Sequence, residues 1–269
     1  MYELRDYLNA INFTKENLMQ SRKIASECLV LLKNNDVLPL NKEIKVALTG
    51  ELASSQDIIG RWSINGERDK VVSLESGFKN ATDNYKIINL NEMEKFNFDL
   101  ENIDTVVVAI GETEDESGEA RSKVDINFSD KQIKLLKRLK SRGLKVVTIV
   151  FAGRPLIMNE VELYSDAILY AYYLGTESGN AICDVLFGDV NPSGKLTMTI
   201  PREIGQIPIY YNNIQTGRPQ KIDSGEGYVS QYIDCENTPK YNFGYGLSYT
   251  KFKFSDLKLK NKEMKIGEE

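Results

Sequence analysis

Short apolar runs alternate along the chain with segments whose apolar residues recur every three or four positions. The clearest runs lie at 45–49, 106–110, 145–151 and 167–173, and a weaker one lies at 86–90. Uniformly apolar, β-branched runs of this length are typical of strands buried on both faces, as in a parallel sheet. The pattern therefore predicts a parallel sheet of about five strands.

Helical spacing is clearest after two of these runs. A helix is predicted from Ser129, which can cap it together with Gln132, and Gly143 is a suitable residue to end it. Its apolar stripe is formed by Ile133, Leu136 and Leu139. A second helix is predicted before Gly188, with Ile182, Val185 and Leu186 as its apolar residues.

The regular alternation of strand and helix predicts an α/β fold. We expect a mostly parallel sheet with helices on both faces, an α/β sandwich layered as in flavodoxin. Residues 1–20 are polar and predict an N-terminal arm, and residues 21–249 predict the folded domain. Within it, residues 200–249 are rich in proline and tyrosine and predict a long ordered loop that wraps the sheet. Residues 250–269 alternate briefly and predict a tail or the start of a following β domain.

An earlier helix is predicted from Ser21 by the helical spacing of Ile24, Cys28 and Leu31. The three cysteines, Cys28, Cys183 and Cys235, are far apart and form no C-x-x-C pair. This spacing favours small buried hydrophobic residues over a disulfide framework or a metal site.

Composition excludes several classes of function. The net charge is −5 and no run of lysine or arginine stands out, so no nucleic-acid partner is expected. The chain has no histidine, which excludes Ser-His-Asp and Cys-His catalysis and every histidine-ligated metal site. No apolar run reaches membrane-spanning length and the first residues lack a signal-peptide core, so no membrane partner is expected. If the chain is complete, these features predict a cytoplasmic location.

The main candidate site is the segment that follows the run at 106–110. Five acidic residues crowd into it: Glu112, Glu114, Asp115, Glu116 and Glu119. Like charges held close together destabilise a fold, and the carboxyl ends of parallel strands are where ligands usually bind. Two interpretations remain open, a ligand site and a solvated loop whose acids cap the next helix.

Trp62, the only tryptophan, lies between two predicted loops. It is either a core residue or, beside a cleft, a side chain that stacks on a sugar ring. No glycine-rich phosphate motif follows any predicted strand, which disfavours nucleotide binding. The acidic segment also lacks the spacing of an EF-hand, which disfavours calcium. No cofactor or metal is expected.

A set of motifs in consistent order over about residues 20–255 resembles the second, C-terminal α/β-sandwich domain of glycoside hydrolase family 3, the β-glucosidase and β-xylosidase type. The motifs lie at 26–34, 38–40, 111–112, 117–122, 153–155, 175–181, 188–196, 206–211, 216–219 and 243–249. The resemblance implies a domain packed beside a TIM barrel in a retaining, exo-acting β-glycosidase. The expected partners are that barrel domain and an oligo- or aryl β-glycoside.

By motif, the resemblance places the catalytic acid/base on Glu119 of the Ser-Gly-Glu-Ala segment and a substrate-binding tryptophan on Trp62. It implies a structural role for Glu112 and a loop-anchoring role for Asp125. The four neighbouring carboxylates are expected to favour the protonated form of Glu119.

Two departures from the family pattern are evident. A barrel needs about 250 residues, almost nothing precedes Ser21, and no aspartate can be assigned as nucleophile. Lys123 stands where the family commonly has arginine, and lysine cannot reproduce a bidentate contact. The alternative hypothesis is a barrel-less remnant that acts as a non-catalytic interaction or carbohydrate-binding module.

Overall fold

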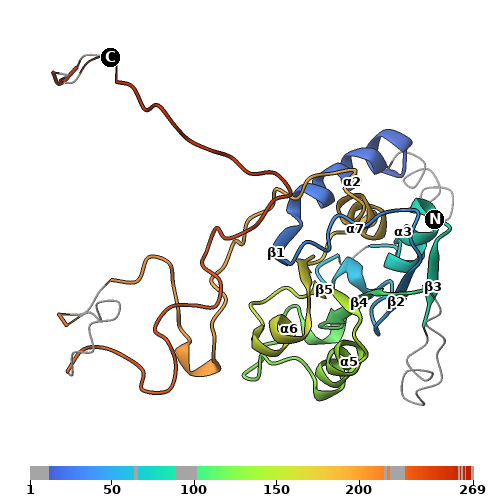
Figure 1. Ribbon diagram of the computed structural model, residues 1–269, viewed down its shortest axis with the longest axis horizontal. Coiled ribbons are helices and arrows are strands. Elements are labelled where there is room, and N and C mark those ends of the chain that lie inside the picture. Colours follow the sequence, from blue (N-terminus) through green and yellow to red (C-terminus); the bar gives the residue numbers. More distant parts are fainter. Residues whose placement is uncertain are drawn as a thin grey trace.

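The computed structural model describes residues 12–63, 66–88, 102–214, 217–218, 228–259, 261, 263 and 265–267. Within these ranges the chain forms a six-stranded sheet with helices on both faces (Figure 1). The strands are β1 (Val30–Asn34), β2 (Val46–Thr49), β3 (Tyr85–Ile87), β4 (Thr105–Gly111), β5 (Lys145–Phe151) and β6 (Ala167–Tyr170). The predicted α/β fold is confirmed.

The strand order is β1-β6-β5-β4-β2-β3. Neighbours from β6 to β3 are parallel, whereas β1 pairs with β6 in the antiparallel direction. The parallel strands alone follow the winding order of flavodoxin, which reverses between β2 and β4. All parallel strands end at the same side of the sheet, which we call the carboxyl edge.

Five helices cover the two faces within the described residues. On one face lie α2 (Lys15–Cys28), α3 (Leu74–Ala81) and α7 (Ser178–Leu186), and on the other lie α5 (Asp130–Ser141) and α6 (Asn159–Tyr164). Each residue of β4 is buried, because its alternate side chains enter the two opposite cores. No helix in the described part of the chain is long and apolar enough to cross a bilayer.

Helix α5 forms as predicted. The Ser129 side chain accepts a hydrogen bond from the backbone N–H of Gln132, and Leu136 and Leu139 are fully buried. Gly143 follows the helix with a φ of 78°, a left-handed conformation that favours glycine.

The N-terminal prediction needs correction. Helix α2 begins at Lys15, ahead of Ser21, where the helix was predicted to start. Ile24 is 60% exposed and Cys28 is also exposed, because α2 turns Ala25 toward the core instead. Leu31 belongs to strand β1, where it pairs with Leu169. The helical spacing of these apolar residues was coincidental, and the prediction of a buried Cys28 was wrong.

Two other strand predictions differ in length. Strand β6 ends at Tyr170 instead of continuing to residue 173, and Tyr172 has a φ of 51°, outside extended geometry. Strand β3 covers Tyr85–Ile87, while residues 89 and 90 of the predicted run lie outside the described residues.

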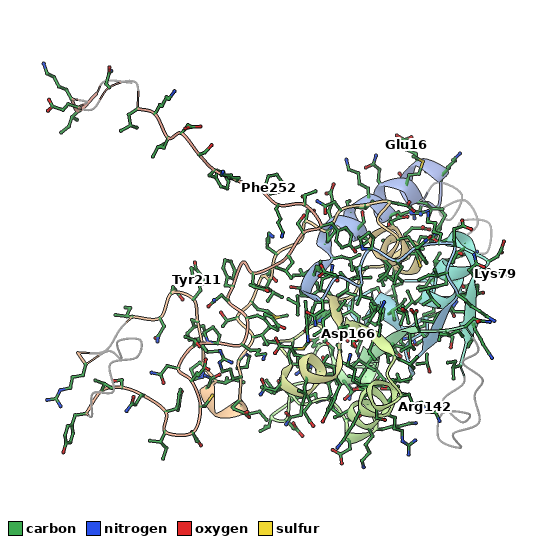
Figure 2. The ribbon with its side chains drawn as sticks, in the orientation of Figure 1. Glu16, Lys79, Arg142, Asp166, Tyr211 and Phe252 are labelled. Atoms are coloured by element: carbon green, nitrogen blue, oxygen red, sulfur yellow. The ribbon has the colours of Figure 1, made fainter. Side chains whose placement is uncertain are left out.

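The C-terminal segments are irregular. Apart from the short 3₁₀ helix η4 (Ile204–Gln206), described residues beyond 201 form only isolated bridges. Much of this region projects away from the layered part (Figure 1), so the expectation that it wraps the sheet was wrong for that portion. The segment 241–249 does return to the sheet, where Leu247 bridges Leu31 of β1. Both sheet faces are already covered by helices. Tyr211 and Phe252 lie on these projecting segments (Figure 2) and are 72% and 81% exposed.

Candidate functional site

Four loops meet at the carboxyl edge of the sheet. They follow β2, β4, β5 and β6, and the first two flank the point where the strand order reverses. In open α/β sheets, ligands bind in the crevice at such a point because the loops on either side diverge toward opposite faces. The acidic segment follows β4 and the Trp62 loop follows β2, so both predicted site residues lie in loops beside the point where the strand order reverses.

The acidic segment begins with a backbone turn that requires glycine. Gly111 has a φ of 137°, and a Cβ there would lie 1.9 Å from the carbonyl oxygen of Phe151 on the adjacent strand. The next residue, Glu112, donates its N–H to that carbonyl at 2.8 Å. After the 3₁₀ helix η3 (Glu114–Glu116), the chain turns again at Gly118, with a φ of 135°. This second turn presents Glu119 to solvent.

Four of the five acidic side chains are paired with cations. Glu112 pairs with Arg154, Glu114 with Arg68, Asp115 with Arg61 and Glu116 with Lys123. Glu119 is exposed and takes part in no ion pair among the described residues. The charge crowding expected from the sequence is therefore largely compensated, and the acids that surround Glu119 do not form a cluster of unbalanced charge.

The pKa values of two of these acids are shifted in opposite directions. Burial raises the pKa of Glu112, whose side chain is 3% exposed, and the nearby Arg154 only partly opposes this effect. Burial also acts to raise the pKa of Glu116, but hydrogen bonds from Lys123 and Thr113 outweigh it and hold the pKa below its ordinary value. Glu116 is therefore a stable anion at neutral pH.

Trp62 is 64% exposed, so the core interpretation is wrong and sugar stacking remains a prediction. Its neighbour Arg61 reaches the acidic segment. The Arg61 guanidinium lies 3.2 Å from Asp115, and its Cδ would be 2.7 Å from a Cβ at Gly118. The loops that carry Trp62 and Glu119 are thus packed against each other.

Arg68 makes a second connection between the same two loops. It lies in the 3₁₀ helix η2 (Arg68–Lys70), donates to Asp57 at 3.0 Å and pairs with Glu114. Asp57 begins the 3₁₀ helix η1 (Asp57–Ile59) in the loop after β2. Neither Arg61 nor Arg68 was predicted as a site residue, because their partners in the acidic segment, Asp115 and Glu114, are far away along the chain.

Arg154 lies in the motif at 153–155, for which no role was predicted, and it contacts the acidic segment and the residues after it at three points. Its Nε lies 2.9 Å from Oε1 of Glu112, and its Nη2 donates to the carbonyl oxygens of Glu116 at 2.5 Å and Arg121 at 2.9 Å. The sequence could have indicated Arg154, because it lies shortly after the end of β5. The carboxyl ends of adjacent parallel strands meet at one edge of the sheet, so Arg154 had to lie near the acidic segment after β4.

Asp125 and Lys123 both act within the loop. Asp125 accepts hydrogen bonds from the backbone and side chain of Asn127, which closes a local turn, and these bonds lower its pKa. Lys123 lies 2.8 Å from Glu116 and 3.7 Å from Glu112, so its ammonium group faces the loop carboxylates.

A groove of about 890 Å³ lies beside this site. Its lining includes Ile24 and Cys28 from α2 and the segment from Tyr172 to Leu174 after β6. The Tyr173 hydroxyl donates to the carbonyl of Glu112 at 3.3 Å, so the wall of the groove is continuous with the acidic segment. In the described ranges, no group of three or more acidic or cysteine side chains is arranged to hold a metal ion.

Comparison with known proteins identifies relatives of this chain. Residues 29–249 match the family described as glycosyl hydrolase family 3 C-terminal domain. A periplasmic beta-glucosidase of Salmonella typhimurium is 39% identical over 91% of this chain and 36% of its own length. A beta-xylosidase of Formosa agariphila is 33% identical over 92% of this chain and 36% of its own length.

The fold matches solved structures equally well. The crystal structure of a beta-glucosidase from Listeria innocua in complex with glucose superposes with a TM-score of 0.85 and 40% sequence identity. The match covers 90% of this chain and 35% of the Listeria chain. The chain thus spans little more than a third of the length of these relatives.

Proposed function

Because this chain belongs to the glycosyl hydrolase family 3 C-terminal domain family, we propose that it supplies the proton donor of a retaining, exo-acting β-glycosidase. The donor is Glu119. The nucleophilic carboxylate lies on a TIM-barrel domain, in the part of the relatives that this chain does not span. The substrate is an oligo- or aryl β-glycoside with a terminal glucose-like or xylose-like sugar, as the names of the relatives suggest.

The observation that carries this proposal is the contrast between Glu119 and its neighbours. The other four carboxylates of the segment are held by cations, whereas Glu119 is exposed on a turn at the carboxyl edge. A general acid must reach the leaving oxygen and must be able to change its protonation state. Among these five acids, Glu119 combines solvent access with freedom from a fixed counterion in the described residues.

The chemistry needs two carboxyl groups about 5–5.5 Å apart. In the first step, the nucleophile attacks the anomeric carbon while Glu119 gives its proton to the glycosidic oxygen. The bond between the anomeric carbon and the glycosidic oxygen breaks. In the second step, the Glu119 carboxylate takes a proton from the water that attacks the anomeric carbon, which releases the nucleophile. Trp62, at the opposite side of the crevice, stacks on the leaving group.

The test joins this chain to the portion of the Listeria innocua beta-glucosidase that it does not match, replacing the matching 35% of that enzyme. We call this fusion the joined enzyme. We expect hydrolysis of 4-nitrophenyl β-glucoside by the joined enzyme and none by this chain alone. Glu119→Gln in the joined enzyme should lower kcat by about 10²- to 10⁴-fold.

The matched control is Glu43→Gln, which changes an exposed glutamate in the turn before β2, at the opposite edge of the sheet. It should leave activity unchanged. Brisk hydrolysis by this chain alone would contradict the need for a separate nucleophile. A folded but inactive joined enzyme, with a chain that still binds β-glucosides, would favour the non-catalytic carbohydrate-binding module.

A further inference from the structure

We propose that Arg154 is a positioning residue for the proton donor, because it ties together both ends of the turn that presents Glu119. This inference rests on the proposed function. The Arg154 guanidinium makes no hydrogen bond or ion pair with residues 117–120 in the described structure. It acts through the backbone on either side of them, at Glu116 and Arg121.

The Arg154 guanidinium contacts the backbone on both sides of the turn, and we call this arrangement the clamp. The Nη2 group of Arg154 donates to the carbonyl of Glu116, two residues before Gly118, and to the carbonyl of Arg121, two residues after Glu119. Each contact fixes the backbone on one side of the turn relative to the same guanidinium. Because Gly118 and Ala120 both adopt positive φ angles, of 135° and 55°, the turn itself has little intrinsic preference for this shape.

Arg154 is held in place by buried groups. Its Nε lies against the carboxylate of Glu112, which is 3% exposed. Its carbonyl oxygen accepts a hydrogen bond from the hydroxyl of the fully buried Tyr170 at 2.5 Å. Both holding groups lie at the ends of sheet strands, Glu112 directly after β4 and Tyr170 as the last residue of β6. The clamp therefore transfers the rigidity of the sheet to the exposed loop.

The clamp requires arginine. A planar guanidinium presents several N–H groups in a fixed fork, so it can serve a carboxylate and two carbonyls at the same time. A lysine ammonium keeps the positive charge but has a single nitrogen on a flexible stem. Arg154→Lys thus preserves the charge beside Glu112 and removes the simultaneous contacts to Glu116 and Arg121.

The test uses the joined enzyme with two aryl β-glucosides that differ in leaving group. Phenol leaves poorly and needs the donor's proton, whereas 2,4-dinitrophenol leaves without it. We compare kcat/KM, which reports the glycosylation step. Arg154→Lys should lower kcat/KM for the phenyl glucoside by about tenfold or more, a fraction of the 10²- to 10⁴-fold supplied by general acid catalysis. The value for the dinitrophenyl glucoside should change by less than about twofold.

Two further variants separate positioning from folding. In a Glu119→Gln background, Arg154→Lys should have no additional leaving-group-dependent effect, since the proton is already absent. The matched control is Arg22→Lys, which alters a two-point ion pair with Asp184 between α2 and α7. It should leave the ratio of the two kcat/KM values unchanged. In this chain alone, hydrogen exchange of the amides at 117–121 should accelerate in Arg154→Lys and not in Arg22→Lys.

The outcomes distinguish this inference from the proposed function. Equal losses on both substrates, or no loss, would overturn the positioning role of Arg154 while Glu119→Gln keeps its selective effect. A Glu119→Gln variant without selective loss on the phenyl glucoside would overturn the assignment of the donor, and with it the residue that Arg154 would position. Unchanged exchange at 117–121 in Arg154→Lys would show that the clamp does not order the turn.

Discussion

The side chain of Arg61 packs against the backbone of Gly118, where an added Cβ would lie 2.7 Å from Arg61 Cδ. Each of these residues directly precedes a predicted site residue, Trp62 in one case and Glu119 in the other. The contact places the two loops side by side at the carboxyl edge. Their relative position is therefore set by packing as well as by charge.

Gly118→Ala should disrupt this contact. A φ of 135° is accessible almost only to glycine, and the added methyl group would meet the Arg61 side chain. We expect a destabilisation of about 1–3 kcal/mol and a loss of activity in the joined enzyme. Urea denaturation and hydrolysis of an aryl glucoside measure the two effects. Gly205→Ala is the control, since a Cβ there meets nothing within 4 Å. Equal stability of the two variants would contradict the packing argument.

Trp62→Ala should affect substrate binding more than stability. The side chain is 64% exposed, so the free energy of unfolding should change by no more than about 0.5 kcal/mol. Loss of aromatic stacking, worth about 0.5–1.5 kcal/mol, should lower kcat/KM for aryl glucosides in the joined enzyme by about two- to tenfold. Trp62→Phe should retain part of the aromatic stacking and lower kcat/KM less than Trp62→Ala does. A large loss of stability would instead assign Trp62 to the core.

Tyr170→Phe and Tyr172→Phe form a matched pair. The Tyr170 hydroxyl donates to the carbonyl of Arg154, whereas the buried Tyr172 hydroxyl has no hydrogen-bond partner in the described part of the structure. Tyr170→Phe should destabilise the chain by about 1–3 kcal/mol, because it leaves a carbonyl unsatisfied. Tyr172→Phe should be neutral or slightly stabilising. Thermal or urea denaturation of this chain measures both, and the reverse order would contradict the assigned hydrogen bonds.

Glu116 should contribute a pH-dependent increment of stability. Its folded pKa is lowered, so the contribution is fully present above the ordinary glutamate pKa, near 4.5, and is lost as the pH falls through the folded value. The pair with Lys123 is partly exposed and should be worth about 0.2–1 kcal/mol. Glu116→Gln should therefore be less stable than the parent at pH 7, and the difference should vanish in acid. A Lys123→Gln background should reduce the difference without removing it, because the hydrogen bonds from Thr113 remain.

Glu119→Gln should leave the fold intact. The side chain is exposed and lacks an ion pair within the described residues, so the free energy of unfolding should change by no more than about 0.5 kcal/mol. Circular dichroism and urea denaturation of this chain test the expectation without any assay of activity. A clear destabilisation would reveal a structural role for this carboxylate and would weaken its assignment as the proton donor.

The sheet was predictable because its parallel strands are buried on both faces and therefore consist of uninterrupted apolar runs. Helix α5 was predictable from its cap and its stripe. The N-terminal region was not, since β1 is an antiparallel strand whose apolar residues continue the spacing of the preceding helix. Periodicity alone cannot separate a helix from a short apolar strand at such a junction.

The site was predictable in part. The motif and the position after a predicted strand placed Glu119 at the carboxyl edge. The prediction of crowded negative charge around it was incomplete, because it considered only residues close in sequence. Arg61 and Arg154 lie 54 and 42 residues from the carboxylates they contact. The sheet brings these arginines to the carboxylates from separate segments, whereas Lys123 pairs with Glu116 from within the same loop.

The reversal of strand order between β2 and β4 has an evolutionary consequence. After β2 the chain continues to α3 on one face, and after β4 it continues to α5 on the other. The two loops are thus separate pieces of chain, and side chains such as Arg61 and Arg68 join them. If the proposed function holds, an insertion in the loop that carries Trp62 would change the contact with the leaving group without shifting the sheet beneath Glu119. The choice of leaving group could then vary while the proton donor stays the same.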